Sequence, residues 1–232
     1  MIKLKDTPLV NEKNTAIAEV RPGFREIVAA VFSKKTVYFL SLAFGAMVFV
    51  NVGYLTWMPT FLHEKFNMSL SASGFASVFY HHLFAFFGVM IGGKFSDKLA
   101  LKRKQVRMEV EYWGLLLGAP FIYMMAVGES QLVCYTGMAL FGLFRGIYDS
   151  NLFAALFDVI EPKYRASSIG IMLAFAFLIG ALAPVILGWV KTVAGLEIGL
   201  ASLSLFYLTG GILIFIGLKL FFKQNYYEEA RL

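Results

Sequence analysis

Six stretches of predominantly apolar residues alternate with shorter polar segments along the chain. A helix that crosses a bilayer needs about 20 such residues, because every backbone amide must be hydrogen-bonded within the hydrocarbon. The third stretch is the shortest, and we expect Glu111 and Gly128 to complete its ends. The pattern predicts an all-α membrane protein with six transmembrane helices, at residues 36–58, 73–93, 112–127, 132–157, 167–190 and 198–222.

The amino-acid composition favours a membrane protein over a soluble one. Hydrophobic residues make up 59% of the 232-residue chain and charged residues 16%, whereas soluble domains contain about 45–50% and about 25%. Such a chain has too few polar side chains to cover the surface of a soluble globule. Its single cysteine, Cys134, excludes an intramolecular disulfide and a cysteine-cluster zinc site.

Lysine and arginine are distributed unequally between the segments that connect the apolar stretches. Of the 21 basic residues, 18 lie in the terminal segments and in the second and fourth connections, whereas the other three connections carry two. Because basic loops face the cytoplasm, we predict a plasma (inner) membrane protein with both termini cytoplasmic. Topology thereby explains the net charge of +6 without a nucleic-acid partner. The predicted domains are a cytoplasmic linker (1–35), a six-helix bundle (36–222) and a cytoplasmic tail (223–232).

A weak internal repeat relates the first three apolar stretches to the last three. Asn51-Val-Gly-Tyr54 in the first stretch parallels Arg145-Gly-Ile-Tyr148 in the fourth, and a proline and then a glycine follow each at similar distances. The two helices concerned run in opposite directions, since three crossings separate them. The pattern indicates a 3+3 inverted repeat, a plan found in many transporters. A chance likeness of a few small residues is the alternative.

Two loop motifs are similar to those of a large transporter family. Residues 92–98 have the sequence GGKFSDK and residues 102–104 the sequence KRK, which resemble the family's Gly-x-x-x-Asp-Arg/Lys loop and its trailing basic residues. Residues 161–170, EPKYRASSIG, resemble its Pro-x-x-Arg-x-x-x-x-Gly loop. The chain thus resembles the C-terminal six-helix half of a major facilitator superfamily transporter. The polar first helix and the arginine in the fourth are most similar to those of organic-anion and sugar-acid symporters.

The resemblance implies alternating access, with a substrate held at the midplane between two six-helix halves. This chain has the length of one half, so either it is part of a split or truncated transporter or two copies form the whole. The loops also predict a conformational latch, in which the Asp97 carboxylate binds the amides at the N-terminus of the fifth helix. Contact of this loop with anionic lipids is the alternative. The predicted latch residues are Gly93, Asp97, Lys98 and Arg165.

Arg145 lies near the middle of the fourth apolar stretch, where an arginine is costly to insert and usually marks a pathway. Asp149 lies four residues further on, and Tyr148 shares this face of the helix. Because the guanidinium fork matches planar anions, we predict that Arg145 binds a substrate carboxylate or phosphate. Asp149 would then release the substrate or carry a proton. An ion pair that only neutralises the two side chains is the alternative.

Further polar residues on the first two helices are candidates for the same site. Asn51 and Tyr54 share a face, and the repeat places them opposite Arg145 and Tyr148, so Asn51, Tyr54 and Tyr148 are predicted substrate-binding residues. Hydrogen bonding between helices explains the first two equally well. Histidine side chains in general titrate near neutrality, which makes His81 and His82 proton-coupling candidates. Neighbouring helical residues point about 100° apart, so at most one faces a cavity, and bonding to another helix is the alternative for each.

The predicted function is transport of a small polar solute, an organic anion or sugar acid, by an ion-gradient-driven half of a secondary transporter. The expected partners are the anionic substrate, a coupling proton or sodium ion, the lipid bilayer, and a complementary six-helix half or a second copy. We expect no enzyme, metal or cofactor, because no paired catalytic set, metal-ligand spacing or phosphate-binding loop is present. The alternative is a truncated, non-transporting scaffold or an inactive half-transporter.

Overall fold

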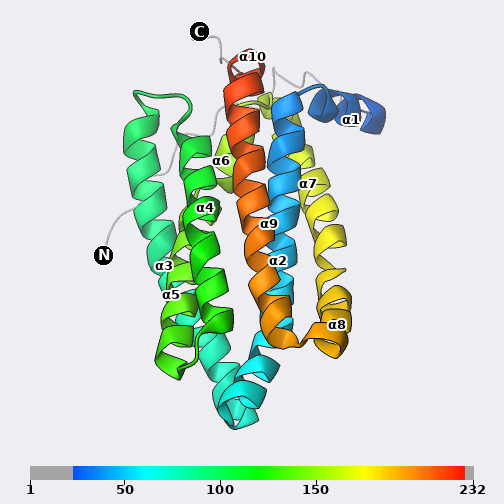
Figure 1. Cartoon of the computed structure of the whole chain (residues 1–232). Helices are drawn as coiled ribbons and strands as arrows, with labels where there is room; N and C mark the ends of the chain where they lie inside the picture. Colours follow the sequence, from blue (N-terminus) through cyan, green and yellow to red (C-terminus); the bar gives the residue numbers. More distant parts are fainter. Residues whose placement is uncertain (1–22, 228–232) are drawn as a thin grey trace, which may run out of the picture.

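The computed structural model describes residues 23–227, which fold into a bundle of long helices lying side by side (Figure 1). Short turns connect successive long helices, which alternate in direction. The helical elements are α1 (Phe24–Phe32), α2 (Lys35–Phe66), α3 (Leu70–Ala100), α4 (Val106–Val127), α5 (Gln131–Asp149), α6 (Leu152–Phe157), the 3-10 turn Pro162–Tyr164, α7 (Arg165–Gly180), α8 (Ala183–Ala194), α9 (Leu196–Gly217), the π-helical turn Leu218–Phe222 and α10 (Lys223–Asn225).

Five helical segments among the described residues are long and apolar enough to cross a bilayer. The prediction of an all-α membrane protein is therefore confirmed, whereas a count of six crossing helices is not. The difference lies in α5, which has only 19 residues and includes Arg145 and Asp149. The five segments are Lys35–Phe66, Leu70–Ala100, Val106–Val127, Pro162–Ala194 and Leu196–Asn225.

The fourth predicted stretch, residues 132–157, is broken into α5 and α6 by a turn at Ser150 and Asn151. The Ser150 hydroxyl donates to the carbonyl of Ile147 at 2.7 Å, and Nδ2 of Asn151 donates to that hydroxyl at 2.8 Å. Such local side-chain bonds compete with the backbone ladder of a helix and favour a turn. Asp149 is consequently the last residue of α5 and does not lie within a continuous helix.

The fifth predicted stretch, residues 167–190, is interrupted as well. α7 ends at Gly180, and α8 begins at Ala183 with Pro184 in its first turn. Proline has no backbone N–H to donate, so it fits the first turn of a helix, where that donor has no partner within the helix. The proline therefore marks the point at which a new helix starts.

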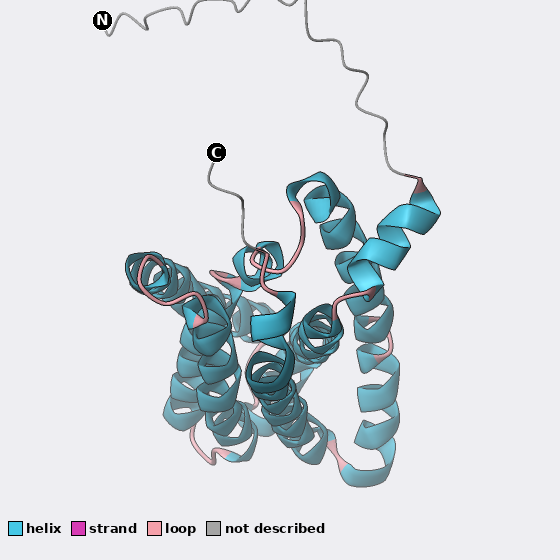
Figure 2. Cartoon of the chain, turned by 90° about the horizontal axis from the view of Figure 1, so that it is seen from above, coloured by secondary structure: helices cyan, strands magenta, loops and turns pink. Residues whose placement is uncertain are grey.

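α5 packs between α3 and α4, and its contact with α3 is made largely by backbone atoms. A Cβ at Gly142 would lie 2.1 Å from the carbonyl oxygen of His81, and a Cβ at Gly146 would lie 2.1 Å from that of Ala85. Small residues of this kind let membrane helices approach closely. The end-on view in Figure 2 shows the helices of the bundle side by side. Arg145 lies between Gly142 and Gly146 in the sequence, so the close contact of α5 with α3 brings Arg145 against α3.

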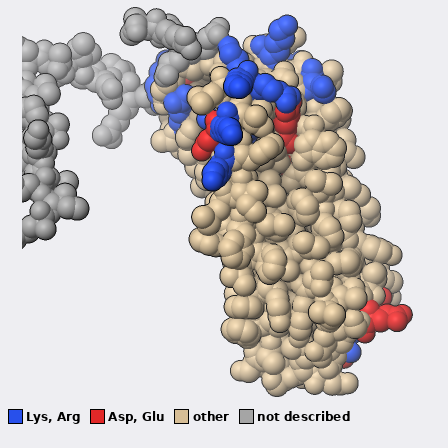
Figure 3. Space-filling model, turned by 90° about the vertical axis from the view of Figure 1, so that its left-hand side faces the viewer, with Lys and Arg blue, Asp and Glu red and all other residues tan. Residues whose placement is uncertain are grey.

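Basic side chains gather at one end of the molecule, which we call the basic end; α1, α6 and α10 lie there (Figure 1). Figure 3 shows Lys and Arg at this end and a broad belt of uncharged residues below it. At the opposite end, Lys65 pairs with Glu197 at 2.7 Å and Lys191 with Glu64 at 2.5 Å. An uncharged belt between two charged ends is the arrangement expected of a protein that spans a bilayer.

Candidate functional site

A polar cluster lies inside the bundle around Arg145 of α5. Its Nη1 is 3.1 Å from Nε2 of His81 on α3, and its Nε is 3.3 Å from Oδ2 of Asp149. Because an arginine N–H donates, Nε2 of His81 is the acceptor. His81 is fully buried, whereas the Arg145 and Asp149 side chains are 17% and 27% exposed. The cluster therefore contains a buried acceptor and a charged pair that is partly accessible from outside the bundle.

Aromatic rings enclose His81 and bring four helices together at this point. The His81 ring centroid is 4.9 Å from that of Tyr54 on α2 and 4.6 Å from that of Phe141 on α5. Phe141 in turn contacts Tyr207 of α9, with 5.3 Å between the ring centroids. These surroundings have low polarity, which strengthens the hydrogen bond and the ion pair made by Arg145.

The other predicted substrate-binding residues, Tyr54, Asn51 and Tyr148, have different environments. The Tyr54 hydroxyl donates to the carbonyl of Ser77 at 2.5 Å, which supports hydrogen bonding between helices, while its contact with substrate stays a prediction. The buried Oδ1 of Asn51 has no hydrogen-bond partner within residues 23–227, and its contact with substrate stays a prediction. Tyr148 is buried against α4, where a Cβ at Gly114 would lie 3.1 Å from its own Cβ.

Replacing Tyr54 with Phe removes only the hydroxyl that binds Ser77. We expect Tyr54→Phe to lower the free energy of unfolding by about 1 kcal/mol, because the buried carbonyl loses its donor. Denaturant unfolding in detergent, followed by circular dichroism, measures the change. Tyr38→Phe is the control, because Tyr38 is 44% exposed. Unchanged stability together with weaker substrate binding would instead favour a substrate-binding hydroxyl.

The two adjacent histidines have different surroundings, and His81 is the one that reaches Arg145. His82 is exposed, and its Nδ1 lies 3.0 Å from the carbonyl of Val78, one turn earlier on the same helix. The expectation that adjacent histidines point in different directions therefore agrees with the structure. Proton coupling by either residue stays a prediction.

The residues of the predicted latch do not meet in this structure. Asp97 is exposed and forms no hydrogen bond or ion pair with another described residue. Arg165 donates instead to the carbonyls of Phe157 and Ile160, at 3.3 and 3.4 Å, and lies over the Phe157 ring. A latch that opens and closes would be open here, and its role stays a prediction. The remaining latch residues, Gly93 and Lys98, lie on α3 beside Asp97.

Glu111 is a buried acid inside α4. The prediction that Glu111 completes the end of this helix is therefore wrong. α4 begins at Val106, so Glu111 lies in its second turn and is completely buried. Neither carboxyl oxygen has a hydrogen-bond partner within the described segment, and the charges that act on it come from Asp149 and Asp158. The signal that could have revealed it is the spacing of Val106, Val110 and Trp113, which continues the helical period toward the basic loop.

An ion pair beside Glu111 joins the start of α4 to the turn after α6. Nη1 of Arg107 donates to Oδ1 of Asp158 at 2.6 Å, and the side chains are 30% and 13% exposed. Burial raises the pKa of the Asp158 carboxyl, and the Arg107 guanidinium partly opposes this shift. The pair thus holds a partly buried acid by one short, charge-assisted hydrogen bond.

The two neighbouring acids are expected to respond differently to neutral substitution. Asp158→Asn leaves an oxygen that can accept from Arg107 but removes the negative charge, and should lower the free energy of unfolding by about 1 kcal/mol. Glu111→Gln keeps the volume and removes no hydrogen bond, so it should change that free energy by less than about 0.5 kcal/mol. Denaturant unfolding of both variants in the same detergent is the measurement. Equal losses would show that Glu111 has a structural partner after all.

A helical bundle with an uncharged belt between two charged ends is typical of a multi-pass membrane protein. A family model described as the Major Facilitator Superfamily matches residues 1–184. The chain belongs to this superfamily, as the motifs in its two basic loops predict. Members of the family transport solutes and are not enzymes, which confirms the expectation that this chain is not an enzyme.

Individual relatives agree with this assignment. The "Hexuronate transporter" of Bacillus subtilis (strain 168) is 25% identical over 222 residues, which cover 94% of this chain and 51% of that protein. A bacterial homologue of the human lysosomal transporter Spinster, inward-facing and unoccupied, has the same fold, with a TM-score of 0.79 at 18% identity over 94% of this chain and 54% of the other. Its occupied form gives 0.70 at 16% identity, over 86% and 52%. The chain thus spans about half the length of these relatives.

Proposed function

We propose that this chain is half of a secondary transporter that carries an organic anion, and specifically a sugar acid, by alternating access. Arg145 is the observation on which the proposal rests. Its guanidinium has five N–H donors, and the described residues accept one hydrogen bond from it, at His81. A positive side chain with spare donors inside an apolar bundle is suited to a carboxylate. The name of the hexuronate transporter, a relative over most of this chain, indicates a substrate of that chemistry.

The proposed mechanism divides the work between the members of the cluster. Arg145 binds the substrate carboxylate, and Oδ1 of Asn51 accepts hydrogen bonds from sugar hydroxyls. Asp149 is 3.3 Å from Arg145, so it neutralises the arginine in the empty state and competes with the arriving anion. Protonation of Asp149 would remove this competition and link uptake to a proton gradient. His81 holds the guanidinium from the α3 side, and His82 is a second candidate for proton coupling.

The proposal also places the chain in a larger assembly. Since it spans about half of its relatives, a complementary six-helix half or a second copy would close the substrate cavity. If α5 is counted as a sixth membrane crossing beside the five apolar segments, two sets of three helices would form the 3+3 inverted repeat. The basic end, where both ends of the described segment lie (Figure 1), would then face the cytoplasm of the plasma (inner) membrane.

Uptake into proteoliposomes tests the proposal. The full-length protein, with any six-helix partner that co-purifies, is reconstituted and offered radiolabelled glucuronate or glucose at equal concentration. We expect glucuronate uptake above that of protein-free vesicles, stimulated by an inward proton or sodium gradient, and no glucose uptake. Equal uptake of both sugars would contradict a site built around Arg145. No uptake of either, from a folded assembly, would favour the alternative of a non-transporting scaffold.

A further inference from the structure

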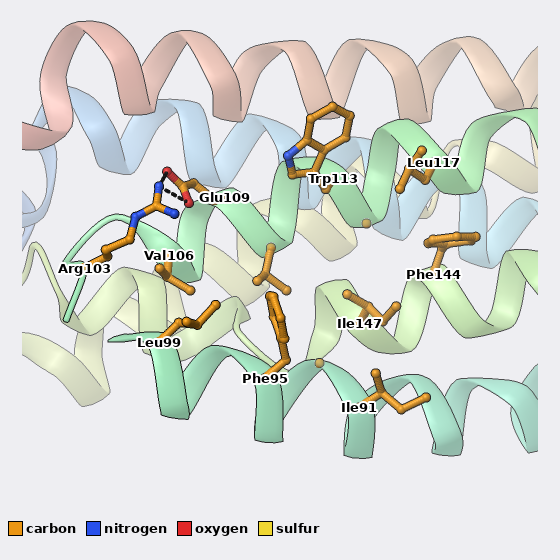
Figure 4. Close-up of a pocket in the computed structure, with 13 residues that line it drawn as sticks. Ile91, Phe95, Leu99, Arg103, Val106, Glu109, Trp113, Leu117, Phe144 and Ile147 are labelled. Carbon is orange, nitrogen blue, oxygen red and sulfur yellow. Dashed lines mark hydrogen bonds and ion pairs between the residues drawn. The ribbon is translucent and has the colours of Figure 1, made fainter. Parts of the chain in front are cut away.

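A groove runs between α3 and α4 near the basic end, and α5 forms its floor (Figure 4). α3 and α4 both pack on α5 but make little contact with each other, which leaves a space of about 370 Å³. Most of its lining is apolar, and several of these side chains are large and exposed on the flank of the bundle. They include Ile91 (56% exposed), Phe95 (58%), Trp113 (50%) and Leu117 (45%).

The mouth of the groove at the basic end is charged. Nη2 of Arg103 donates to both carboxylate oxygens of Glu109, at 2.7 and 2.9 Å, as the dashed lines in Figure 4 show. The Arg103 side chain is 61% exposed, and no described residue accepts a hydrogen bond from its other nitrogens. Trp113 lies further along the same wall of the groove. An arginine at the charged end of a membrane protein, followed further along the helix by a tryptophan, is typical of the interfacial layer of a bilayer.

A row of lysines borders the groove on α3 and in the turn that follows it. Lys94 and Lys98 are four residues apart and lie along one side of α3, and Lys102 follows in the turn after Ala100. The groove residues Phe95 and Leu99 repeat at the same spacing, about 100° further around. All three lysines are exposed, and none forms an ion pair with another residue of the described segment. The apolar groove therefore has, along one edge, three lysines that are not ion-paired within the described segment.

We propose that the groove binds an anionic phospholipid, with an acyl chain against Phe95, Trp113 and Leu117 and the phosphate near Arg103 and the three lysines. The apolar lining suits a hydrocarbon chain and gives a small soluble anion nothing to bind. The positive edge favours an anionic over a zwitterionic head group, and basic pockets between membrane helices bind such lipids. The proposal rests on the groove and its charges, and holds whether or not Arg145 binds a sugar acid.

Photo-crosslinking tests which lipid occupies the groove. The full-length protein, carrying p-benzoylphenylalanine in place of Leu117, is reconstituted in vesicles of phosphatidylglycerol and phosphatidylethanolamine with matched acyl chains. Illumination and mass spectrometry then give the ratio of the two lipid adducts. We expect the ratio of phosphatidylglycerol to phosphatidylethanolamine adducts to exceed the ratio of the two lipids in the vesicles at least about fivefold. The matched control is Ile212 of α9, which is 51% exposed outside the groove and should report the bulk ratio.

Charge removal provides the second arm of the experiment. Replacing Lys94, Lys98, Lys102 and Arg103 together with glutamine should return the Leu117 ratio to that of the bulk, while Lys219→Gln, at the same end on the far side of α4, should not. A total adduct yield at Ile212 equal to that of the unaltered protein would show that the variant remains folded in the membrane. A bulk ratio at Leu117 in the unaltered protein would overturn the proposal, as would an anionic preference that survives loss of the four charges. An absence of lipid adducts at Leu117 would show that protein fills the groove, and would overturn it equally.

Discussion

Replacing Arg145 with glutamine is expected to reduce glucuronate uptake by at least about thirtyfold, because truncating one partner of the charge pair that Arg145 would form with the enclosed substrate carboxylate costs about 2–5 kcal/mol. The glutamine amide keeps two N–H donors but carries no charge, and it leaves Asp149 without the counter-ion that lies 3.3 Å away. Initial rates of uptake across a range of substrate concentrations measure the effect. Arg25→Gln is the control, since Arg25 is exposed on α1 outside the cluster.

A lysine at the same position separates charge from geometry. Arg145→Lys retains the positive charge but offers a point donor in place of a planar fork. We expect it to restore part of the uptake lost in Arg145→Gln, and to raise the KM for glucuronate. Full restoration would mean that the anion binds as a point charge. Wild-type uptake by the glutamine variant would remove Arg145 from the substrate pathway altogether.

The largest stability effect is expected at the contact between α3 and α5. A Cβ at Gly142 would lie 2.1 Å from the carbonyl oxygen of His81, so Gly142→Ala forces the two helices apart. We expect a net loss of about 1–3 kcal/mol in the free energy of unfolding, since overpacking outweighs the better helix propensity of alanine. Because His81 moves with its carbonyl, binding of substrate by Arg145 should weaken as well.

Gly74 on α3 offers the matched control. A Cβ there would meet nothing within 4 Å, so only the helix propensity changes. Gly74→Ala should therefore raise the free energy of unfolding by about 0.5–1 kcal/mol. Denaturant titration of both variants in one detergent gives the comparison. The same sign for both substitutions would show that close approach of the backbones is not what requires Gly142.

Apolar periodicity predicts where helices lie along this chain, but it does not locate their interruptions. Residues 132–157 are apolar enough to suggest one helix, yet the bonds made by Ser150 and Asn151 divide it. A hydropathy window averages over those two polar residues. The same averaging placed Glu111 at an end, because an acid inside a helix lowers the mean that defines the window. Local hydrogen bonds made by Ser150 and Asn151 decide the first case.

The site is only partly predictable for a different reason. Arg145 and Asp149 share one helix, so the four-residue spacing predicts their contact. The contact between Arg145 and His81 joins two helices, and it depends on how deeply the glycines of α5 let α3 approach. Nothing in the spacing of His81 and His82 indicates which of them faces α5. Pairs within a helix follow from the sequence alone, whereas pairs between helices follow from packing.

The glycine contact between α3 and α5 has a mechanical consequence. Backbone atoms meet there with no flexible side chain between them, and such a contact yields little under load because close-packed backbone atoms cannot rotate aside. Arg145 and His81, one on each helix, are therefore held at a fixed separation and are carried as a unit while the protein changes shape. Bending would be concentrated instead between α7 and α8, where one helix ends at Gly180 and the next begins at Ala183. The substrate site would then keep its geometry while the path to it opens and closes.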